Sequence, residues 1–265
     1  MTITIADLQK KYLQNEKLTM ITTYDATFAR LVEAAGIDMI LIGDSLGNVM
    51  QGRDNTLSVT VDDIIYHASC VMRGCQTPFV IADMPFGSYQ VCDEDGVRNG
   101  IRILKESGVH AVKIEGGKRC VPLIKKLVQA GVPVMGHIGL TPQSVNTMSG
   151  YRVQGKAEQD AENLFQDALA LEEAGVFSIT LECVPRQLAK RIQDAVKIPM
   201  IGIGAGPDTA GQVLVIQDAL GMGLGKKTKF VRQFASLADT ITEALKTYAS
   251  VVKDGSFPSD AESYH

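Results

Sequence analysis

The sequence predicts one α/β domain of the TIM (β/α)8 barrel class over residues 1–265, with a short N-terminal helix and a long C-terminal helix. Eight short apolar runs rich in β-branched residues alternate with stretches of helical periodicity. Most of these helical stretches end at a glycine, and no linker interrupts the pattern. The chain has 265 residues, close to the ~250 that are typical of such a barrel. A doubly wound parallel sheet is the alternative, because it is built from the same alternation.

The eight apolar runs are the predicted strands. Each is short, bounded by polar or glycine-containing segments, and followed by a helical pattern. In chain order they are Met20–Asp25, Met39–Asp44, Phe79–Met84, Ala111–Gly116, Pro133–Ile138, Ser178–Cys183, Pro199–Gly204 and Val213–Asp218.

The predicted helices lie between these runs. They are Thr27–Ala35, Val61–Met72, Asp95–Ser107, Val121–Ala130, Ala157–Ala174, Arg186–Val196 and the long final Phe230–Val252. A glycine follows five of them, which suits the residue after a helix, where φ is often positive. These glycines are Gly36, Gly74, Gly108, Gly131 and Gly175.

Charge and cysteine content exclude several classes of function. A formal net charge of −4 and a pI near 5.6 lack the basic excess needed to bind nucleic acid or an anionic membrane surface. The first residues become charged too soon for a secretory signal, and no apolar run approaches ~18 residues, so we expect a cytoplasmic protein. Five cysteines at irregular spacing, with no CxxC pair, indicate neither disulfides nor a zinc site.

Ionisable residues stand at or near the C-terminal ends of seven different runs. A barrel gathers these ends on one face, where active sites are built. Helix capping is the alternative role for some of the acids, and Asp25 and Asp218 are the first candidates for it. Crowded carboxylates repel one another unless a cation or a proton compensates, so the pattern favours a metal site. The seven residues are Asp25, Asp44, Asp83, Glu115, His137, Glu182 and Asp218.

Three of these acids and a neighbouring hydroxyl predict a magnesium site. Asp44, Ser45, Asp83 and Glu115 offer the hard oxygen ligands that Mg²⁺ prefers. Because Mg²⁺ usually takes one or two carboxylates and keeps waters, we expect at least one acid to bind through water. The charges of the three carboxylates, Mg²⁺ and Lys113 add up to zero.

Lys113 and Glu115 are two residues apart on one predicted strand. Their side chains therefore point to the same side, which is the interior of a barrel. They could form a structural ion pair. Burying such a pair is costly and often gains no net stability, which favours a functional role.

Glu182 ends the sixth run, outside the metal set, and is the candidate general base. A carboxylate is a weak base, so the metal must supply most of the acidification of the substrate. His137 is a second candidate, as a ligand or an acid–base group, or merely a hydrogen-bonded side chain. The glycine-rich stretch Gly202–Gly206 could bind phosphate or only let a loop turn closely.

Six motifs in this order resemble those of the ketopantoate hydroxymethyltransferase family, over nearly the whole chain. They are TTYDATFARL (Thr22–Leu31), LIGDSLGNVMQGRDNTLSVTVDDIIYH (Leu41–His67), VKIEGG (Val112–Gly117), GHIGLTPQSVN (Gly136–Asn146), LECVP (Leu181–Pro185) and IGIGAG (Ile201–Gly206).

The resemblance implies a TIM barrel related to phosphoenolpyruvate mutase and isocitrate lyase, assembled as a homo-decamer. It implies that a hydroxymethyl group passes from methylenetetrahydrofolate to the 2-oxo acid 3-methyl-2-oxobutanoate, giving 2-dehydropantoate through an enolate stabilised by Mg²⁺. This reaction is the first committed step toward pantothenate. By motif, Asp44 and Asp83 bind metal and substrate, and Glu115 belongs to the metal site. Ser45 and Lys113 bind substrate, and Glu182 accepts the proton.

Two other functions fit the same barrel. A Mg²⁺-dependent lyase or mutase would make its enolate by cleaving a bond, and the known lyases of this group use a reactive cysteine in a mobile loop. Cys183, next to Glu182, is the nearest candidate for such a cysteine. A barrel kept as a metal- or ligand-binding regulator is the non-enzymatic alternative.

Overall fold

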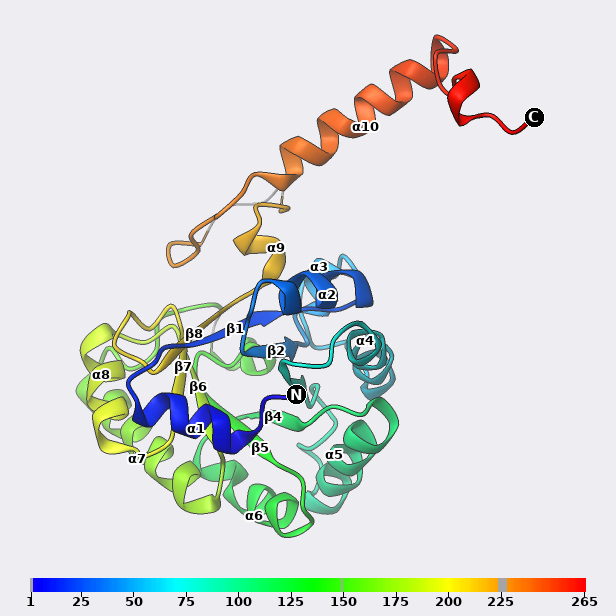
Figure 1. The fold of residues 1–265 in the computed structure, drawn as a ribbon. Helices are drawn as coiled ribbons and strands as arrows, with labels where there is room; N and C mark the ends of the chain where they lie inside the picture. Colours follow the sequence, from blue (N-terminus) through cyan, green and yellow to red (C-terminus); the bar gives the residue numbers. More distant parts are fainter. Residues whose placement is uncertain (1, 149, 224–227) are drawn as a thin grey trace. The chain divides into compact units, whose positions relative to one another are not determined.

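The predicted barrel is confirmed. The computed structural model describes residues 2–148, 150–223 and 228–265. Eight parallel strands close on themselves in chain order, with β8 paired to β1 (Figure 1). The chain divides into two compact units, Met1–Val215 and Ile216–His265, and the barrel lies in the first.

The strands overlap all eight predicted runs. They are β1 Leu18–Thr22, β2 Met39–Ile42, β3 Phe79–Asp83, β4 Ala111–Glu115, β5 Val134–Gly139, β6 Ser178–Glu182, β7 Met200–Ile203 and β8 Gly211–Leu214. The last prediction, Val213–Asp218, was displaced toward the C-terminus because its apolar run continues past Leu214 into helix α9 (Ile216–Ala219). Asp218 therefore lies in a helix of the second unit and not at a strand end.

Helices of the first unit separate most of the strands and surround the barrel (Figure 1). The longer helices of this unit are α1 Ile5–Leu13, α2 Ala26–Ala34, α4 Val61–Gly74, α5 Asp93–Ser107, α6 Val121–Gln129, α7 Glu158–Ala174 and α8 Arg186–Ala195, and the second unit contains α10 Leu237–Lys253. The short ones are α3 Leu46–Val49, α9 and the 3-10 turns η1 Lys118–Cys120, η2 Pro142–Ser144 and η3 Asp260–Glu262. The final helix begins at Leu237, whereas the sequence analysis predicted a start at Phe230.

Four of the five glycines predicted to follow helices have positive φ, namely Gly36, Gly108, Gly131 and Gly175. Gly74 differs because it is the last residue of α4 itself. A Cβ at Gly74 would run into the backbone of Ala26, at the start of α2. Gly74 thus permits a close approach of two helices.

The barrel interior is filled by alternate residues of the strands. α1 lies across one end of the barrel (Figure 1), and its Leu8 packs into the same cluster. The buried cluster is made of Leu8, Leu18, Met20, Met39, Leu41, Phe79, Ile81, Ala111, Met135, Ile201 and Val213. Because side chains alternate along a strand, the residues two positions further on face the same interior. On β3, β4 and β5 those residues are Asp83, Lys113 and His137, so the apolar core gives way to ionisable groups at the C-terminal ends of the strands.

No helix among the described residues is both long enough and apolar enough to cross a membrane.

Candidate active site

An ion pair joins Asp83 of β3 to Lys113 of β4. The two residues are register partners on neighbouring strands, and Nζ lies 2.8 Å from Oδ1. Both side chains are only 4% exposed. The other oxygen of Asp83 accepts a hydrogen bond from the backbone N–H of Asp44 at 2.9 Å. The ion-pair partner of Lys113 is therefore Asp83, across the strands, and not Glu115 on its own strand.

His137 of β5 continues this pair into a row of charged groups. Its Nδ1 lies 3.1 Å from Nζ of Lys113 and 3.4 Å from Oε1 of Glu115, its register partner on β4. Its Nε2 lies 3.2 Å from Oε2 of Glu182, at the end of β6. That contact lacks hydrogen-bond geometry, so Nε2 is buried without a hydrogen-bond partner. Asp83, Lys113, His137 and Glu182 form a continuous row, hereafter the polar row, across four neighbouring strands.

Asp44 and Ser45 follow β2 and lie beside this row. Asp44 is 4% exposed, and its Oδ2 accepts a hydrogen bond from Nε2 of Gln143 at 2.9 Å. The Ser45 hydroxyl is 2.8 Å from the phenol oxygen of the buried Tyr24. The structure thus brings together all seven of the predicted site residues: Asp44, Ser45, Asp83, Lys113, Glu115, His137 and Glu182.

Three residues of this region were missed by the sequence argument. Gln143, in turn η2 after β5, donates from its backbone N–H to Oε2 of Glu115 at 3.0 Å. Tyr89 donates to Oε1 of Gln143 at 2.8 Å. Tyr24 holds Ser45 as described above. Each lies in a loop, where strand periodicity gives no signal.

Burial and mutual repulsion perturb the pKa values of the acids. Burial first, and then the charges of Asp83 and Glu115, hold the pKa of Asp44 well above its usual range. Burial also raises the pKa of Asp83, against the opposing effect of Lys113. Glu115 differs. Burial raises its pKa, but the hydrogen bonding and charge of His137, the charge of Lys113 and the N–H of Gln143 together outweigh burial and lower it.

The two cations of the site are stabilised by these same acids. Burial disfavours the charge on Lys113, but Asp83, Glu115 and Asp44 outweigh it and raise the pKa of the ammonium above its ordinary value. Burial and the nearby Lys113 also oppose protonation of His137. Contacts with Glu115 and Glu182 outweigh both and raise the pKa of His137 to about 9.

The donor set fits a hard divalent cation held by few protein ligands. Asp44 and Asp83 are linked through the Asp44 N–H, and burial raises the pKa of both carboxyls, so a bound cation would favour their ionised forms. Both oxygens of Glu115 are already engaged, by the N–H of Gln143 and by His137, which suits a role through water. Within the described parts of the chain, no three His, Cys, Asp or Glu side chains are grouped to hold a metal. Mg²⁺ needs only one or two carboxylates, so this is compatible with the donor set.

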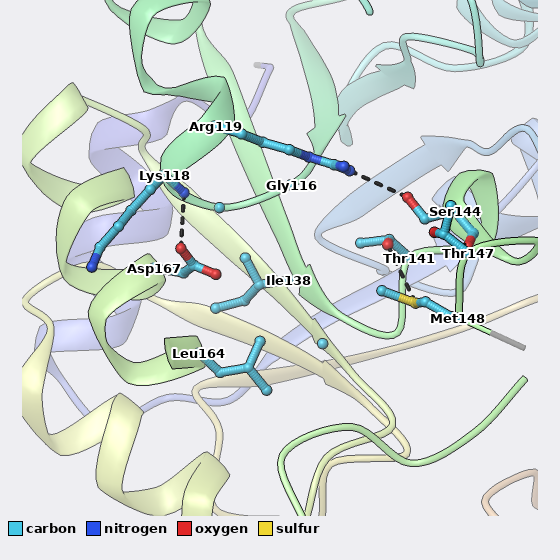
Figure 2. Close-up of a pocket in the computed structure, with 12 residues that line it drawn as sticks. Gly116, Lys118, Arg119, Ile138, Thr141, Ser144, Thr147, Met148, Leu164 and Asp167 are labelled. Atoms are coloured by element: carbon cyan, nitrogen blue, oxygen red, sulfur yellow. Dashed lines mark hydrogen bonds between the residues drawn. The ribbon is translucent and has the colours of Figure 1, made fainter. Parts of the chain in front are cut away.

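A pocket of about 300 Å³ opens next to the polar row. Gly116, which directly follows Glu115, and Gly139, at the end of β5, form part of its wall. Figure 2 shows hydrogen bonds between residues that line it, including the weak one from the Thr141 hydroxyl to the sulfur of Met148. The backbone N–H of Lys118 donates to Asp167 at 2.9 Å, and the Arg119 guanidinium donates to the Ser144 hydroxyl at 3.2 Å. None of the predicted site residues lines this pocket, so it is a separate compartment beside them.

The structure also shows the local roles of Asp25 and of the glycine-rich stretch Gly202–Gly206. Asp25 caps α2, because its carboxylate accepts from the backbone N–H groups of Thr27 and Phe28 at 2.8 and 2.9 Å. In the glycine-rich stretch, Gly204 and Gly206 have φ of 63° and 83°. A Cβ on Gly206 would also clash with the side chain of Arg186. The backbone itself therefore requires glycine there.

A family model and individual relatives both match this chain, and they agree on the family. The model of the family described as ketopantoate hydroxymethyltransferase matches residues 2–260. A 3-methyl-2-oxobutanoate hydroxymethyltransferase from Heliobacterium modesticaldum is 53% identical over 262 residues, covering 99% of this chain and 95% of the relative. One of the same description from Syntrophomonas wolfei is 51% identical, covering 97% and 94%.

Solved structures with the same fold are more distant in sequence. 2,3-Dimethylmalate lyase, a member of the PEP mutase/isocitrate lyase superfamily, superimposes with a TM-score of 0.60 at 19% identity, covering 100% of this chain and 93% of that one. Phosphonopyruvate hydrolase, in complex with oxalate and Mg²⁺, gives 0.63 at 13% identity, covering 98% and 93%. At these identities the likeness supports the barrel fold alone.

Proposed function

The chain belongs to the ketopantoate hydroxymethyltransferase family, a family of transferases, and we propose that it converts 3-methyl-2-oxobutanoate to 2-dehydropantoate. The one-carbon donor is methylenetetrahydrofolate, the metal is Mg²⁺, and the reaction is the first committed step toward pantothenate. The observation that carries the proposal is the polar row. It supports the proposal because a buried ammonium and a more exposed carboxylate share one barrel face, with Asp44 and Glu115 beside them.

The substrate binds where the charges of this face are complementary to a 2-oxo acid. Lys113 supplies a buried positive charge for the oxygen atoms of the substrate, and Ser45 supplies a hydroxyl oriented by Tyr24. Asp44 and Asp83, with Glu115 acting through water, would hold Mg²⁺. When bound, the ion would polarise the keto group and so acidify the C3 proton.

Glu182 takes the C3 proton. Its side chain is 15% exposed, whereas those of Asp83, Glu115 and His137 are no more than 4% exposed, so it is the acid of the site most open to a bound molecule. The imidazole of His137 lies behind this carboxylate, with its Nε2 3.2 Å from Oε2 of Glu182. Lys113 stabilises the negative charge that develops on the substrate oxygen, an electrostatic effect that is large in a buried site.

The donor binds in the pocket beside the polar row. Lys118 and Arg119 give its rim positive charge, which suits the carboxylates of the glutamate part of a folate. The pocket begins at Gly116, next to Glu115, so it adjoins the face on which the 2-oxo acid is proposed to bind. The C3 carbon of the 2-oxo acid attacks the methylene carbon, which forms the new carbon–carbon bond and breaks one of the two bonds between the methylene carbon and the folate nitrogens. Water then cleaves the second carbon–nitrogen bond, so that its hydroxyl completes the hydroxymethyl group and its proton goes to the nitrogen of the departing tetrahydrofolate.

An assay with all three components tests the proposal. The purified protein is mixed with 3-methyl-2-oxobutanoate, Mg²⁺ and methylenetetrahydrofolate, and tetrahydrofolate and 2-dehydropantoate are followed with time. Equal amounts of both products are expected. A lyase would consume an acid without consuming folate, and a binding regulator would consume neither, so either result would contradict the proposal.

A further inference from the structure

We propose that Gln143 is a positioning residue, which holds Asp44 and Glu115 in the arrangement that binds the metal. The inference rests on the proposed function, because that function supplies the metal. Gln143 lies in η2, the turn that follows β5, and is 5% exposed. It contacts Asp44, in the loop after β2, and Glu115, on β4. Among the described residues, no other residue hydrogen-bonds to the carboxylates of both acids.

Both the backbone and the side chain of Gln143 donate hydrogen bonds to this site. Its backbone N–H donates to Oε2 of Glu115 at 3.0 Å. Its side-chain Nε2 donates to Oδ2 of Asp44 at 2.9 Å and to the carbonyl oxygen of Met84, just after β3, at 2.9 Å. One residue thereby ties together the ends of three neighbouring strands around the acids.

The orientation of the amide is fixed from its other side. Oε1 of Gln143 accepts from the Tyr89 hydroxyl at 2.8 Å and from Nε2 of Gln90 at 3.1 Å. If the amide were flipped, Oε1 would face two other acceptors, Oδ2 of Asp44 and the carbonyl oxygen of Met84. Its Nε2 would then face another donor, Nε2 of Gln90. Both amide hydrogens and both lone pairs of the side chain are used in the observed orientation. Gln143 therefore presents a donor to Asp44.

A neutral donor suits a carboxylate that must also bind a cation. A lysine or arginine at this position would bring a positive charge that competes with the metal. A carboxylate left without a donor would rotate away from its crowded neighbours. Mg²⁺ demands near-octahedral geometry, and losing the partner that orients a ligand typically costs about 10–100-fold in metal affinity.

The test measures metal binding directly, without substrate or folate. Mn²⁺ is used as the probe, and its dissociation constant is determined by electron paramagnetic resonance of the free ion. Gln143→Met keeps the length of the side chain and the backbone N–H to Glu115, but removes the donors to Asp44 and Met84. We expect a dissociation constant at least ~10-fold higher than that of the natural protein.

Gln193→Met is the matched control. Gln193 is also buried, and its amide is equally engaged, with Tyr12, Ile198, Met200 and Ala210. Gln193 lies on α8 and accepts a hydrogen bond from the backbone N–H of Met200, the first residue of β7. The acids of the site lie at the other, C-terminal ends of the strands. We expect its substitution to lower the melting temperature while leaving the Mn²⁺ dissociation constant within about twofold of the natural value, as additivity of distant sites predicts.

Tyr89→Phe is the second variant, in case Gln143→Met does not fold. It leaves Gln143 in place but removes the hydroxyl that fixes its amide, so the dissociation constant should rise several-fold. An unchanged constant in either folded Gln143→Met or Tyr89→Phe overturns the inference, as does an equal rise in Gln193→Met. A natural protein that binds no Mn²⁺ overturns both the inference and the metal of the proposed function. One that binds Mn²⁺ but transfers no hydroxymethyl group overturns the proposed function alone.

Discussion

The imidazole Nε2 of His137 lies 3.2 Å from Oε2 of Glu182, across the neighbouring strands β5 and β6. On its other side the same ring meets Lys113 and Glu115. Glu182 is thus the more exposed end of the polar row, whereas Asp83, at the other end, is buried.

Replacing Glu182 by glutamine should abolish removal of the C3 proton. The amide keeps the size of the side chain but cannot accept a proton, and general-base catalysis is typically worth 10²–10⁴-fold, so exchange should slow by at least about 100-fold. The measurement incubates 3-methyl-2-oxobutanoate, Mg²⁺ and protein in D₂O without folate and follows the C3 signal by NMR. Glu173→Gln, on the exposed side of α7, is the control. If Glu182→Gln binds the substrate and exchanges the C3 proton at the rate of the natural protein, Glu182 is not the base.

Asp83→Asn and Glu115→Gln should weaken the dependence on Mg²⁺ far more than Asp218→Asn does. The first two acids surround the predicted metal position, whereas Asp218 lies on α9 in the other unit. We expect the half-saturating Mg²⁺ concentration to rise about 10-fold or more for the first two and to stay unchanged for the third. Equal titration curves in all three would contradict the metal set.

Thermal melting must accompany this experiment, because Asp83→Asn leaves Lys113 buried without its counter-charge. Breaking a buried pair in this way typically costs about 3–5 kcal/mol of stability. The titration is therefore interpreted only at temperatures where each variant remains folded.

The barrel and most of its charged face follow from local sequence rules. Asp83, Lys113 and His137 stand two residues beyond apolar residues of their strands, so alternation alone places them in the interior. Asp218 shows where the same rule fails. The apolar run from Val213 continues through Ile216, and nothing in its hydrophobicity marks the change from strand β8 to helix α9.

Contacts made through loops could not be predicted in this way. Gln143 reaches Asp44 over 99 positions of the chain, and Tyr24 meets Ser45 over 21. Such pairs depend on the three-dimensional course of the turns after the strands, which has no periodic signature. The partner of Lys113 depends on the register between β3 and β4, and this is likewise absent from either strand alone.

The metal-free protein should lose stability as the pH rises from about 6.5 to about 9. The contacts with Glu115 and Glu182 raise the pKa of His137 to about 9 in the folded state, despite burial and Lys113. A group whose pKa is higher in the folded than in the unfolded chain stabilises fully below its unfolded pKa, ~6.5 for histidine, and loses this contribution as pH passes the folded value. The loss is at most roughly 3 kcal/mol. Urea unfolding at several pH values measures it, and the decrease should be smaller in His137→Asn.

Cys183 should be dispensable, in contrast to the reactive cysteine of a lyase. Burial, and then the charge of Glu182, raise the pKa of its thiol to about 12, so almost no thiolate exists at neutral pH. We expect Cys183→Ser to keep at least about half of the natural kcat, since neither proton transfer nor nucleophilic attack is assigned to it. Slow modification of Cys183 by a thiol reagent, compared with the exposed Cys92, gives an independent measurement. Loss of activity in folded Cys183→Ser would favour the lyase mechanism.

Arg119→Ala should impair binding of the folate and leave binding of the 2-oxo acid unchanged. Arg119 lines the pocket beside the polar row, and its guanidinium is held toward Ser144 (Figure 2). A charge-assisted hydrogen bond to a carboxylate contributes about 1.5–3 kcal/mol, so the KM for methylenetetrahydrofolate should rise by about 10-fold or more. Steady-state kinetics with each substrate varied in turn separates the two KM values. Lys125→Ala, which removes an exposed positive charge from α6, controls for the change in net charge and should alter neither. A rise in the KM of the 2-oxo acid equal to that of the folate would show that the pocket is not a separate donor compartment.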